Sequence, residues 1–432
     1  MSRYSRPGLS TGASLKGFQF SASGSRTYLL LISALAVKIV LSALSVWGYE
    51  FRYWARASTI HYPMLPSSRT PIAYLMNAIY GVWLLLPLEH PGLYWLIDGA
   101  FTPSASIYML AIMLKAPILI ADILCGLLIY RMAFEYAGRH QAFAALALWL
   151  LNPYITLTAE MQGSIDLIPT FFVLASVLFF MRNKLSLSAL SLASGTAIKF
   201  YPLLLLPLFC LFPLRLERRK ELAKFILASL LGVSAYVYWV TSSGMNFLLT
   251  FTEFSPLTQE FLEIGLVTPY APRLGLSTIF CFVYLYAFYQ CWSAGQESLV
   301  DAVLGFLLVL MAFLNWQPQY QLWIMPFLTL DYALKKTRGA YFASYLLTAF
   351  LFQLIAFNFT LGNSLFYIPN YTVQMQSASD FLSQISKDAA TVIVGKPILR
   401  SCFAAISLLC SAKIFLRNAP SLKALLPQIG TP

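Results

Sequence analysis

Charge is scarce in this chain. Only 11% of its 432 residues are Asp, Glu, Lys or Arg, whereas 59% are hydrophobic. A soluble protein of this size carries about 25% charged residues. Apolar runs long enough to cross a bilayer, which takes about 20 residues, recur along the whole length, and the alternating segments of an outer-membrane barrel are absent. The sequence therefore predicts an all-α, polytopic membrane protein.

Residues that bind metals or form disulfides are also few. The three histidines are scattered, and the six cysteines lie within apolar segments without a CxxC pair. We interpret these cysteines as small core residues. The sequence has no Walker loop, no GxGxxG, no HExxH and no supported GxSxG. It also has no DxD-like pair in a soluble domain, which argues against a metal-dependent nucleotide-sugar enzyme. We expect no metal and no cofactor.

The apolar spans define the expected organisation. A polar tail (1–26) precedes a single membrane-embedded domain (27–416), and a second tail (417–432) follows. Two short apolar halves flank Lys199-Phe-Tyr-Pro202 within 185–214, so we expect a broken or hairpin element there, and about 10–12 membrane segments in all. The other expected spans are roughly 27–48, 105–130, 141–158, 165–181, 223–243, 277–293, 299–315, 319–334, 341–357 and 396–416.

Basic residues orient these spans. With a cytoplasmic N-terminus and a broken block that returns to its own side, most Lys and Arg residues fall on the inner side, as the positive-inside rule requires. The polar loops 49–104, 244–276 and 358–395 then face outward and carry short helices, including an amphipathic stretch from Pro71 to Leu88. The net charge of +12 is better explained by this topology than by a nucleic-acid partner. Membrane lipid is an expected partner.

Polar residues within or beside apolar spans are the first candidates for a site, because charge at membrane depth is costly. Asp166 opens a span, with Glu160 and Gln162 just before it. These groups either cap a helix or line a site. Lys199 lies at the break, where it either extends to an interface, pairs with a buried acid, or binds a phosphate. Lys38, Lys115 and Asp122 lie within spans, and we favour a structural ion pair among the three.

Further candidates follow the spans on the outer side. Glu50 lies beyond the first span and either accepts a proton from a hydroxyl or is a solvated loop acid. Arg52 and Arg273 are candidates for anion binding. The turn 315–320 carries amides and aromatic rings, including Gln319 and Tyr320, which suit a sugar or an interfacial anchor.

Several local patterns resemble those of one family. They are Lys115-Ala-Pro117 with Asp122, Trp149-Leu-Leu-Asn-Pro153 with Gln162-Gly-Ser-Ile-Asp166, Ile198-Lys-Phe-Tyr-Pro202 with Pro207, and Gln319-Tyr-Gln-Leu-Trp323 with Pro326. In this order and spacing the chain resembles the GT-C superfamily of integral-membrane glycosyltransferases. It resembles most the prokaryotic polyprenyl-phosphate-sugar mannosyltransferases and their relatives that build GPI anchors.

The resemblance implies a function and a site. A sugar, with mannose expected, would move with inversion from a polyprenyl- or dolichyl-phosphate donor to a glycan or glycolipid acceptor on the extracytoplasmic or lumenal side. Glu50 would be the catalytic base, although the family more often has Asp there, and Asp166 is the other candidate for that role. Lys199 would bind the phosphate, and the other expected substrate-binding residues are Asp166, Gln162, Glu160, Arg52, Tyr201, Gln319, Tyr320 and Arg273.

Two other hypotheses remain open from the residues. In a transporter or flippase of lipid-linked sugars, the carboxylates and lysines would form a proton or substrate path. In a non-catalytic membrane subunit, the same residues would be structural. The absence of an obvious internal repeat weakens the transporter hypothesis.

Overall fold

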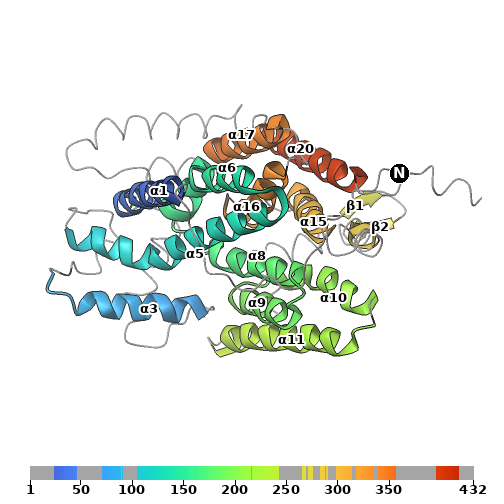
Figure 1. The fold of residues 1–432 in the computed structure, drawn as a ribbon, viewed down its shortest axis with the longest axis horizontal. Coiled ribbons are helices and arrows are strands. Elements are labelled where there is room, and N and C mark those ends of the chain that lie inside the picture. The colour runs from blue at the N-terminus through green and yellow to red at the C-terminus, as the bar shows by residue number, and fades with distance from the viewer. Residues whose placement is uncertain are drawn as a thin grey trace, which may run out of the picture.

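A computed structural model describes the greater part of the chain, and its elements are almost all helical (Figure 1). A two-stranded antiparallel hairpin, β1 (Gly265–Thr268) and β2 (Ala271–Gly275), departs from the all-α expectation in one predicted outer loop. The described residues are 24–45, 71–88, 90, 105–215, 217–242, 265–268, 271–275, 283–287, 289, 298–313, 318–334, 339–356 and 396–417.

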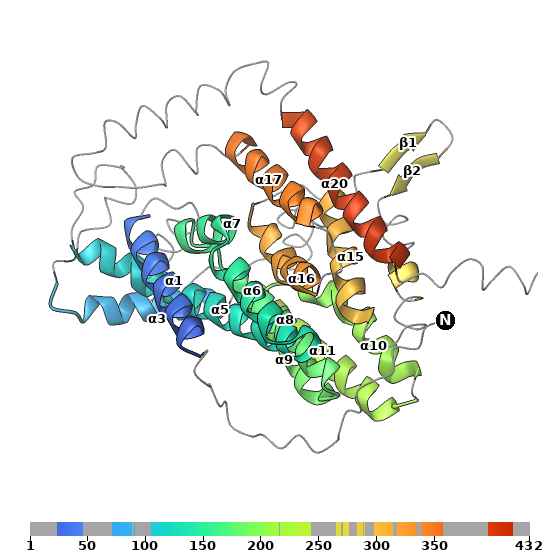
Figure 2. The same cartoon turned by 45° about the horizontal axis from the view of Figure 1, so that its top comes forward.

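The N-terminal helices pack around the longest described helix. Helix α5 contacts α1, α3, α6 and α8, and it extends from the left edge to the centre of the molecule in both views (Figures 1 and 2). Pro117 lies inside α5 without ending it, as membrane helices tolerate. The bounds are α1 (Gly24–Leu44), α3 (Pro71–Leu84), α5 (Ala105–Ala137) and α6 (Arg139–Leu150).

The apolar run 141–158 does not form the single straight helix that the sequence suggests. Helix α6 ends at Leu150, and Asn152 begins a new element, because its side-chain oxygen accepts a hydrogen bond from the backbone N–H of Tyr154 at 3.0 Å and Pro153 follows at a helix start. The short helix α7 (Pro153–Ile155) continues into the π-helix η1 (Thr156–Met161). Insertions of this kind are frequent at functional sites.

The expected break at Lys199 is confirmed. Helix α9 (Leu185–Ile198) ends there, and Lys199 has an extended backbone conformation. Pro202 has no N–H to donate to the carbonyl four residues earlier, at Ile198, so an α-helix cannot continue through this point. The chain resumes as the 3-10 helix η2 (Tyr201–Leu205) and α10 (Leu206–Arg215), and α11 (Arg219–Ser242) then packs closely against α9.

The C-terminal helices form the other side of the core. In both views α17 and α20 lie side by side, with α15 and α16 beneath them (Figures 1 and 2). Helix α16 contacts α5, α6 and α8, which joins the two halves of the chain. The bounds are α15 (Leu299–Phe313), η4 (Pro318–Tyr320), α16 (Gln321–Ala333), α17 (Gly339–Ala356) and α20 (Lys396–Arg417).

The described helices fit a membrane protein. Five segments are long and apolar enough to cross a bilayer: Thr27–Leu44, Ala105–Ala137, Arg139–Met161, Arg219–Tyr238 and Ile398–Leu416. Many large apolar side chains on them are exposed, including Leu29, Ile32, Leu227 and Leu231, and such surface is stable in contact with lipid. The chain is therefore an integral membrane protein. Its predicted orientation stays a prediction.

Close packing between α9 and α11 depends on Gly232. A Cβ atom at this position would lie 2.6 Å from the backbone oxygen of Ala193 and 3.1 Å from its Cα. Gly232→Ala should therefore destabilise the protein by about 1–3 kcal/mol, despite the better helix propensity of Ala. The midpoint of thermal unfolding in detergent measures this. Ser234→Ala, on the exposed face of α11, is the matched control, and equal midpoints for both variants would contradict the prediction.

Candidate functional site

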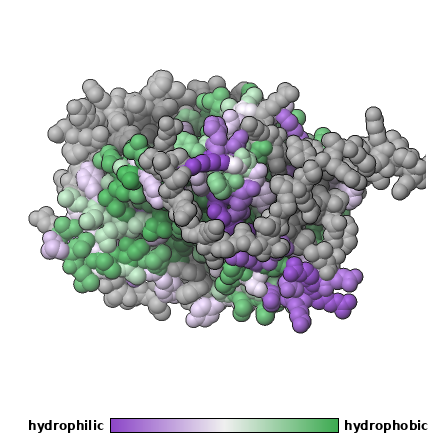
Figure 3. Space-filling view, in the orientation of Figure 1, coloured by the Kyte–Doolittle hydropathy of each residue, from purple (hydrophilic) through white to green (hydrophobic). Residues whose placement is uncertain are grey.

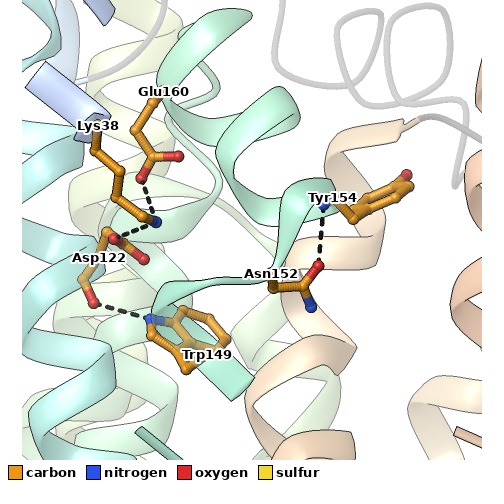
Figure 4. A network of polar contacts seen from close by, with 6 residues as sticks. All are labelled: Lys38, Asp122, Trp149, Asn152, Tyr154 and Glu160. Carbon is orange, nitrogen blue, oxygen red and sulfur yellow. Dashed lines mark hydrogen bonds and ion pairs between the residues drawn. The ribbon is translucent and has the colours of Figure 1, made fainter. Parts of the chain in front are cut away.

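A buried cluster of charges joins three elements that are distant in sequence. Lys38 of α1 donates to Asp122 Oδ2 of α5 at 2.7 Å and to Glu160 Oε1 of η1 at 3.1 Å (Figure 4). All three side chains are at most 2% exposed. The remaining carboxylate oxygens, Asp122 Oδ1 and Glu160 Oε2, have no hydrogen-bond partner among the described residues. We name Lys38, Asp122 and Glu160 the triad.

Lys115 is buried nearby but has other partners. Its ammonium donates to the backbone oxygens of Ser42, Ser45 and Met161 and to Ser45 Oγ, at 2.9–3.1 Å. The expected ion pair is thus confirmed for Lys38 and Asp122, whereas Lys115 binds carbonyl oxygens at the end of α1 and of η1. Two cations and two carboxylates are buried together, so the region can be neutral without exposing any of them.

Hydrogen bonds near the triad also fix the position of η1. The indole N–H of Trp149 donates to the backbone oxygen of Asp122 at 3.1 Å, and the Tyr154 hydroxyl donates to the backbone oxygen of Pro318 at 3.1 Å. Figure 4 shows Trp149 beside Asp122, with Asn152 and then Tyr154 lying farther from the triad. The segment from α6 to η1 is therefore held against α5 on one side and η4 on the other.

A tight turn connects η1 to the second charged pair. Gly163 has φ of +79°, a conformation that favours glycine, and its N–H bonds to the backbone oxygen of Ala159 at 3.0 Å as at a helix C-terminus. The turn 162–166 ends at Asp166, which is the N-cap residue of α8 (Leu167–Met181). Because η1 is fixed by Lys38 and Lys115, the position of Asp166 depends on the triad.

Lys199 forms a salt bridge with Asp166. The Asp166 side chain is 1% exposed and that of Lys199 is 31% exposed, so the lysine is the accessible member. Helices α8 and α9 pack against each other, and the pair joins the N-terminus of α8 to the C-terminus of α9. A carboxylate suits the partial positive charge of the first helix end and an ammonium the partial negative charge of the second. Both helix dipoles therefore stabilise the pair in its ionised form.

Two aromatic rings lie beside the Lys199 ammonium. Its Nζ lies 5.4 Å from the ring centroid of Tyr320 and 5.7 Å from that of Trp323, within the range of cation–π contact. Tyr201 stacks on Trp323 with centroids 4.0 Å apart and planes at 7°. The Tyr201 hydroxyl shares a hydrogen bond of 2.9 Å with Thr170 Oγ1. We name Asp166, Lys199, Tyr201, Tyr320 and Trp323 the lysine–aromatic cluster.

The other predicted site residues lie elsewhere. Gln162 is buried in the turn after η1, Gln319 is half-buried in η4 next to Tyr320, and Glu160 belongs to the triad. The backbone of Arg273 lies in β2, but its side chain is not described. Glu50 and Arg52 lie outside the described residues, so the assignment of the catalytic base stays a prediction.

Two residues at the lysine–aromatic cluster, Thr170 and Trp323, were not among the site residues predicted from the sequence. Thr170 also donates to the backbone oxygen of Asp166 at 2.7 Å, and the spacing of four residues from Asp166 was a usable signal. Trp323 was visible in its motif, but only the fold shows that its ring stacks on Tyr201. Among the described residues, no three His, Cys, Asp or Glu side chains are grouped as metal ligands would be.

The chain is similar to one family model and to solved structures. The family model described as GPI transamidase subunit PIG-U matches residues 84–277, a stretch that includes Glu160, Asp166 and Lys199. Among solved structures, the chain is similar to ArnT from Cupriavidus metallidurans, crystallised with undecaprenyl phosphate. The TM-score is 0.49 and the identity 14%, over 92% of this chain and 77% of ArnT. No curated protein matches the chain significantly.

The triad gives a prediction about stability. Lys38→Met leaves two buried carboxylates without their cation, which costs about 3–5 kcal/mol where a buried pair is broken in this way. We expect a clearly lower midpoint of thermal unfolding in detergent.

The double variant Lys38→Met/Asp122→Leu is the matched comparison. It removes one of the stranded charges and fills the space with apolar atoms, so it should recover part of the lost stability. The stability losses of Lys38→Met and Asp122→Leu are also measured separately. If the loss in the double variant equals their sum, the two residues are not coupled.

Proposed function

We propose that the chain is a membrane glycosyltransferase that transfers a sugar from a polyprenyl-phosphate donor to a glycan or glycolipid acceptor. The observation that carries the proposal is the lysine–aromatic cluster. A half-buried ammonium at the break of an apolar helix, with the rings of Tyr320 and Trp323 beside it and Tyr201 stacked on Trp323, suits a phosphate that is linked on one side to a lipid and on the other to a sugar.

Lys199 is the residue that would bind the phosphate of the donor. Among the described residues its ammonium donates only to Asp166, although an ammonium has three N–H donors. A phosphate oxygen that approaches the exposed side of Nζ would therefore gain a charge-assisted hydrogen bond without displacing Asp166. During transfer the negative charge on the leaving phosphate increases, so this contact would strengthen at the transition state.

The aromatic rings are buried, so they would form the packed wall beside a bound sugar. Tyr320 and Trp323 are held by packing, with ring centroids 4.6 Å apart, and Tyr201 stacks on Trp323. Pockets that hold small ligands combine such apolar faces with a few placed polar groups. Mannose remains the expected sugar from the sequence resemblance.

The proposed chemistry needs one base. The acceptor hydroxyl oxygen bonds to the anomeric carbon while the bond from that carbon to the phosphate oxygen breaks, with inversion. The electron pair leaves with the lipid phosphate, and the hydroxyl proton passes to the Glu50 carboxylate. Asp166 is less suited to be the base, because its carboxylate is buried and paired with Lys199.

Lys199→Gln should reduce kcat/KM for transfer from polyprenyl-phosphate mannose by about 100-fold, since it removes a charge that stabilises the leaving group. Lys199→Arg should recover part of the activity. Transfer of radiolabelled sugar to an acceptor mixture by purified protein measures both.

Lys413→Gln is the matched control, because Lys413 also lies over an aromatic ring, that of Tyr341, but belongs to α20. Full transfer activity in Lys199→Gln, or an equal loss in the control, would remove Lys199 from the donor site.

Glu50→Gln should reduce kcat by about 100-fold or more while donor binding changes little, because a general base acts on the acceptor proton and not on the donor. Rates at saturating donor and a separate donor-binding measurement distinguish the two effects. An active Glu50→Gln variant would exclude Glu50 as the base.

A second candidate function is a membrane subunit that binds a glycolipid without transferring a sugar. The match to the family described as GPI transamidase subunit PIG-U favours it. In that case the wild-type protein would bind lipid-phosphate sugar or glycolipid through Lys199 and show no transfer in the same assay. Uptake driven by a proton gradient, again without transfer, would instead support a transporter.

A further inference from the structure

A hollow with a mixed polar and apolar lining lies at the opposite end of α9 from Lys199. Its volume is about 280 Å³, and it is lined by residues of the turn between α8 and α9 and of the start of α11. The lining residues are Asn183, Lys184, Leu185, Ser186, Leu187, Arg218 and Glu221. The proposed transfer reaction uses none of them.

Charge is concentrated around this hollow. Residues 182–184 and 217–224 hold six Lys and Arg residues and two Glu. Figure 3 shows hydrophilic side chains gathered over the end of the molecule where α10 ends and α11 begins. Arg182 pairs with Glu135, but Lys184 and Arg218 line the hollow itself. The only acid in the lining is Glu221, so the hollow has a net positive charge.

Two helix ends add to this charge. Helices α9 and α11 pack side by side, and their N-termini both border the hollow, so the two helices run in the same direction. No side chain caps the N-terminus of α9. The partial positive charges of the two N-termini therefore combine at one place, an arrangement that favours an anionic group such as a phosphate.

The surface next to the hollow is apolar. Leu187 is itself part of the lining and is 44% exposed, and Leu190 continues the same exposed face along α9. On α11, Ile226, Leu227, Leu230 and Leu231 are exposed within about four turns of Arg218. Because Arg219–Tyr238 is a candidate membrane span, this apolar face begins where a bilayer surface is expected to lie.

We propose that this hollow binds the phosphate headgroup of an anionic phospholipid, with the acyl chains lying along the apolar face of α9 and α11. A free anion would use only the charges, whereas a phospholipid uses both the charges and the adjoining apolar surface. The site is separate from the lysine–aromatic cluster, and the proposal holds whether or not the chain transfers sugars.

The test is native mass spectrometry of the full-length protein from mixed micelles that contain phosphatidylglycerol or phosphatidylcholine. Wild type should retain one phosphatidylglycerol more tightly than phosphatidylcholine. Lys184→Gln/Arg218→Gln should weaken that retention by about 10-fold or more, since each basic residue near a membrane surface contributes substantially to binding of anionic lipid.

Lys220→Gln/Lys224→Gln is the matched control, because it removes two positive charges from the same end of the molecule without changing the lining. It should retain the lipid within about 2-fold of wild type. An equal loss in both double variants would mean diffuse attraction and would overturn the proposal. Inorganic phosphate that displaces phosphatidylglycerol at similar concentrations would overturn the lipid assignment.

Discussion

The need to pair buried charge determines how the centre of this protein is built. Lys38 and Lys115 are each 1% exposed, and they meet carboxylates and backbone oxygens contributed by segments up to 122 residues away in sequence. An unpaired charge at these positions would cost several kcal/mol. The first helix is therefore fixed against α5 and η1. A shift of the π-helix would separate the buried Glu160 carboxylate from the Lys38 ammonium.

This constraint extends to the lysine–aromatic cluster. The chain runs from Glu160 through the turn at Gly163 to Asp166 in six residues, so a fixed η1 leaves little freedom for the Asp166 carboxylate. Asp166 in turn sets the position of Lys199, which lies at the broken end of α9. A helix break inside an apolar block exposes backbone polar groups, and it is tolerated only where protein or a polar cavity covers them. Here Tyr201 of η2, Tyr320 of η4 and Trp323 of α16 pack around the break.

Much of this architecture was predictable from the residues. Apolar length identified most helices, and Pro202 explains why the break at Lys199 could be located without coordinates. The partners of the buried lysines were harder to predict. Lys115 and Asp122 share one face of α5, which suggested a local pair, but Lys38 reaches Asp122 from another helix and Lys115 turns to carbonyl oxygens. Such choices depend on which helices pack together, and one sequence does not reveal this. The division of 141–158 was missed because apolar length hides the capping by Asn152.

The charge balance at Lys199 sets a condition on any donor site there. Its ammonium already faces a carboxylate and the partial negative charge of a helix C-terminus, so a phosphate would be the third negative group around one cation. One lysine does not neutralise all three, and the remaining charge would have to be balanced by another cation. The sequence offers Arg52 and Arg273 on the same predicted side. At the other end of α9 the balance is reversed, because two helix N-termini and two basic side chains face a single glutamate. The charges around α9 are therefore more favourable for an anion at its N-terminus than at its C-terminus, so a phosphate at Lys199 requires a further cation, whereas a headgroup beside Lys184 does not.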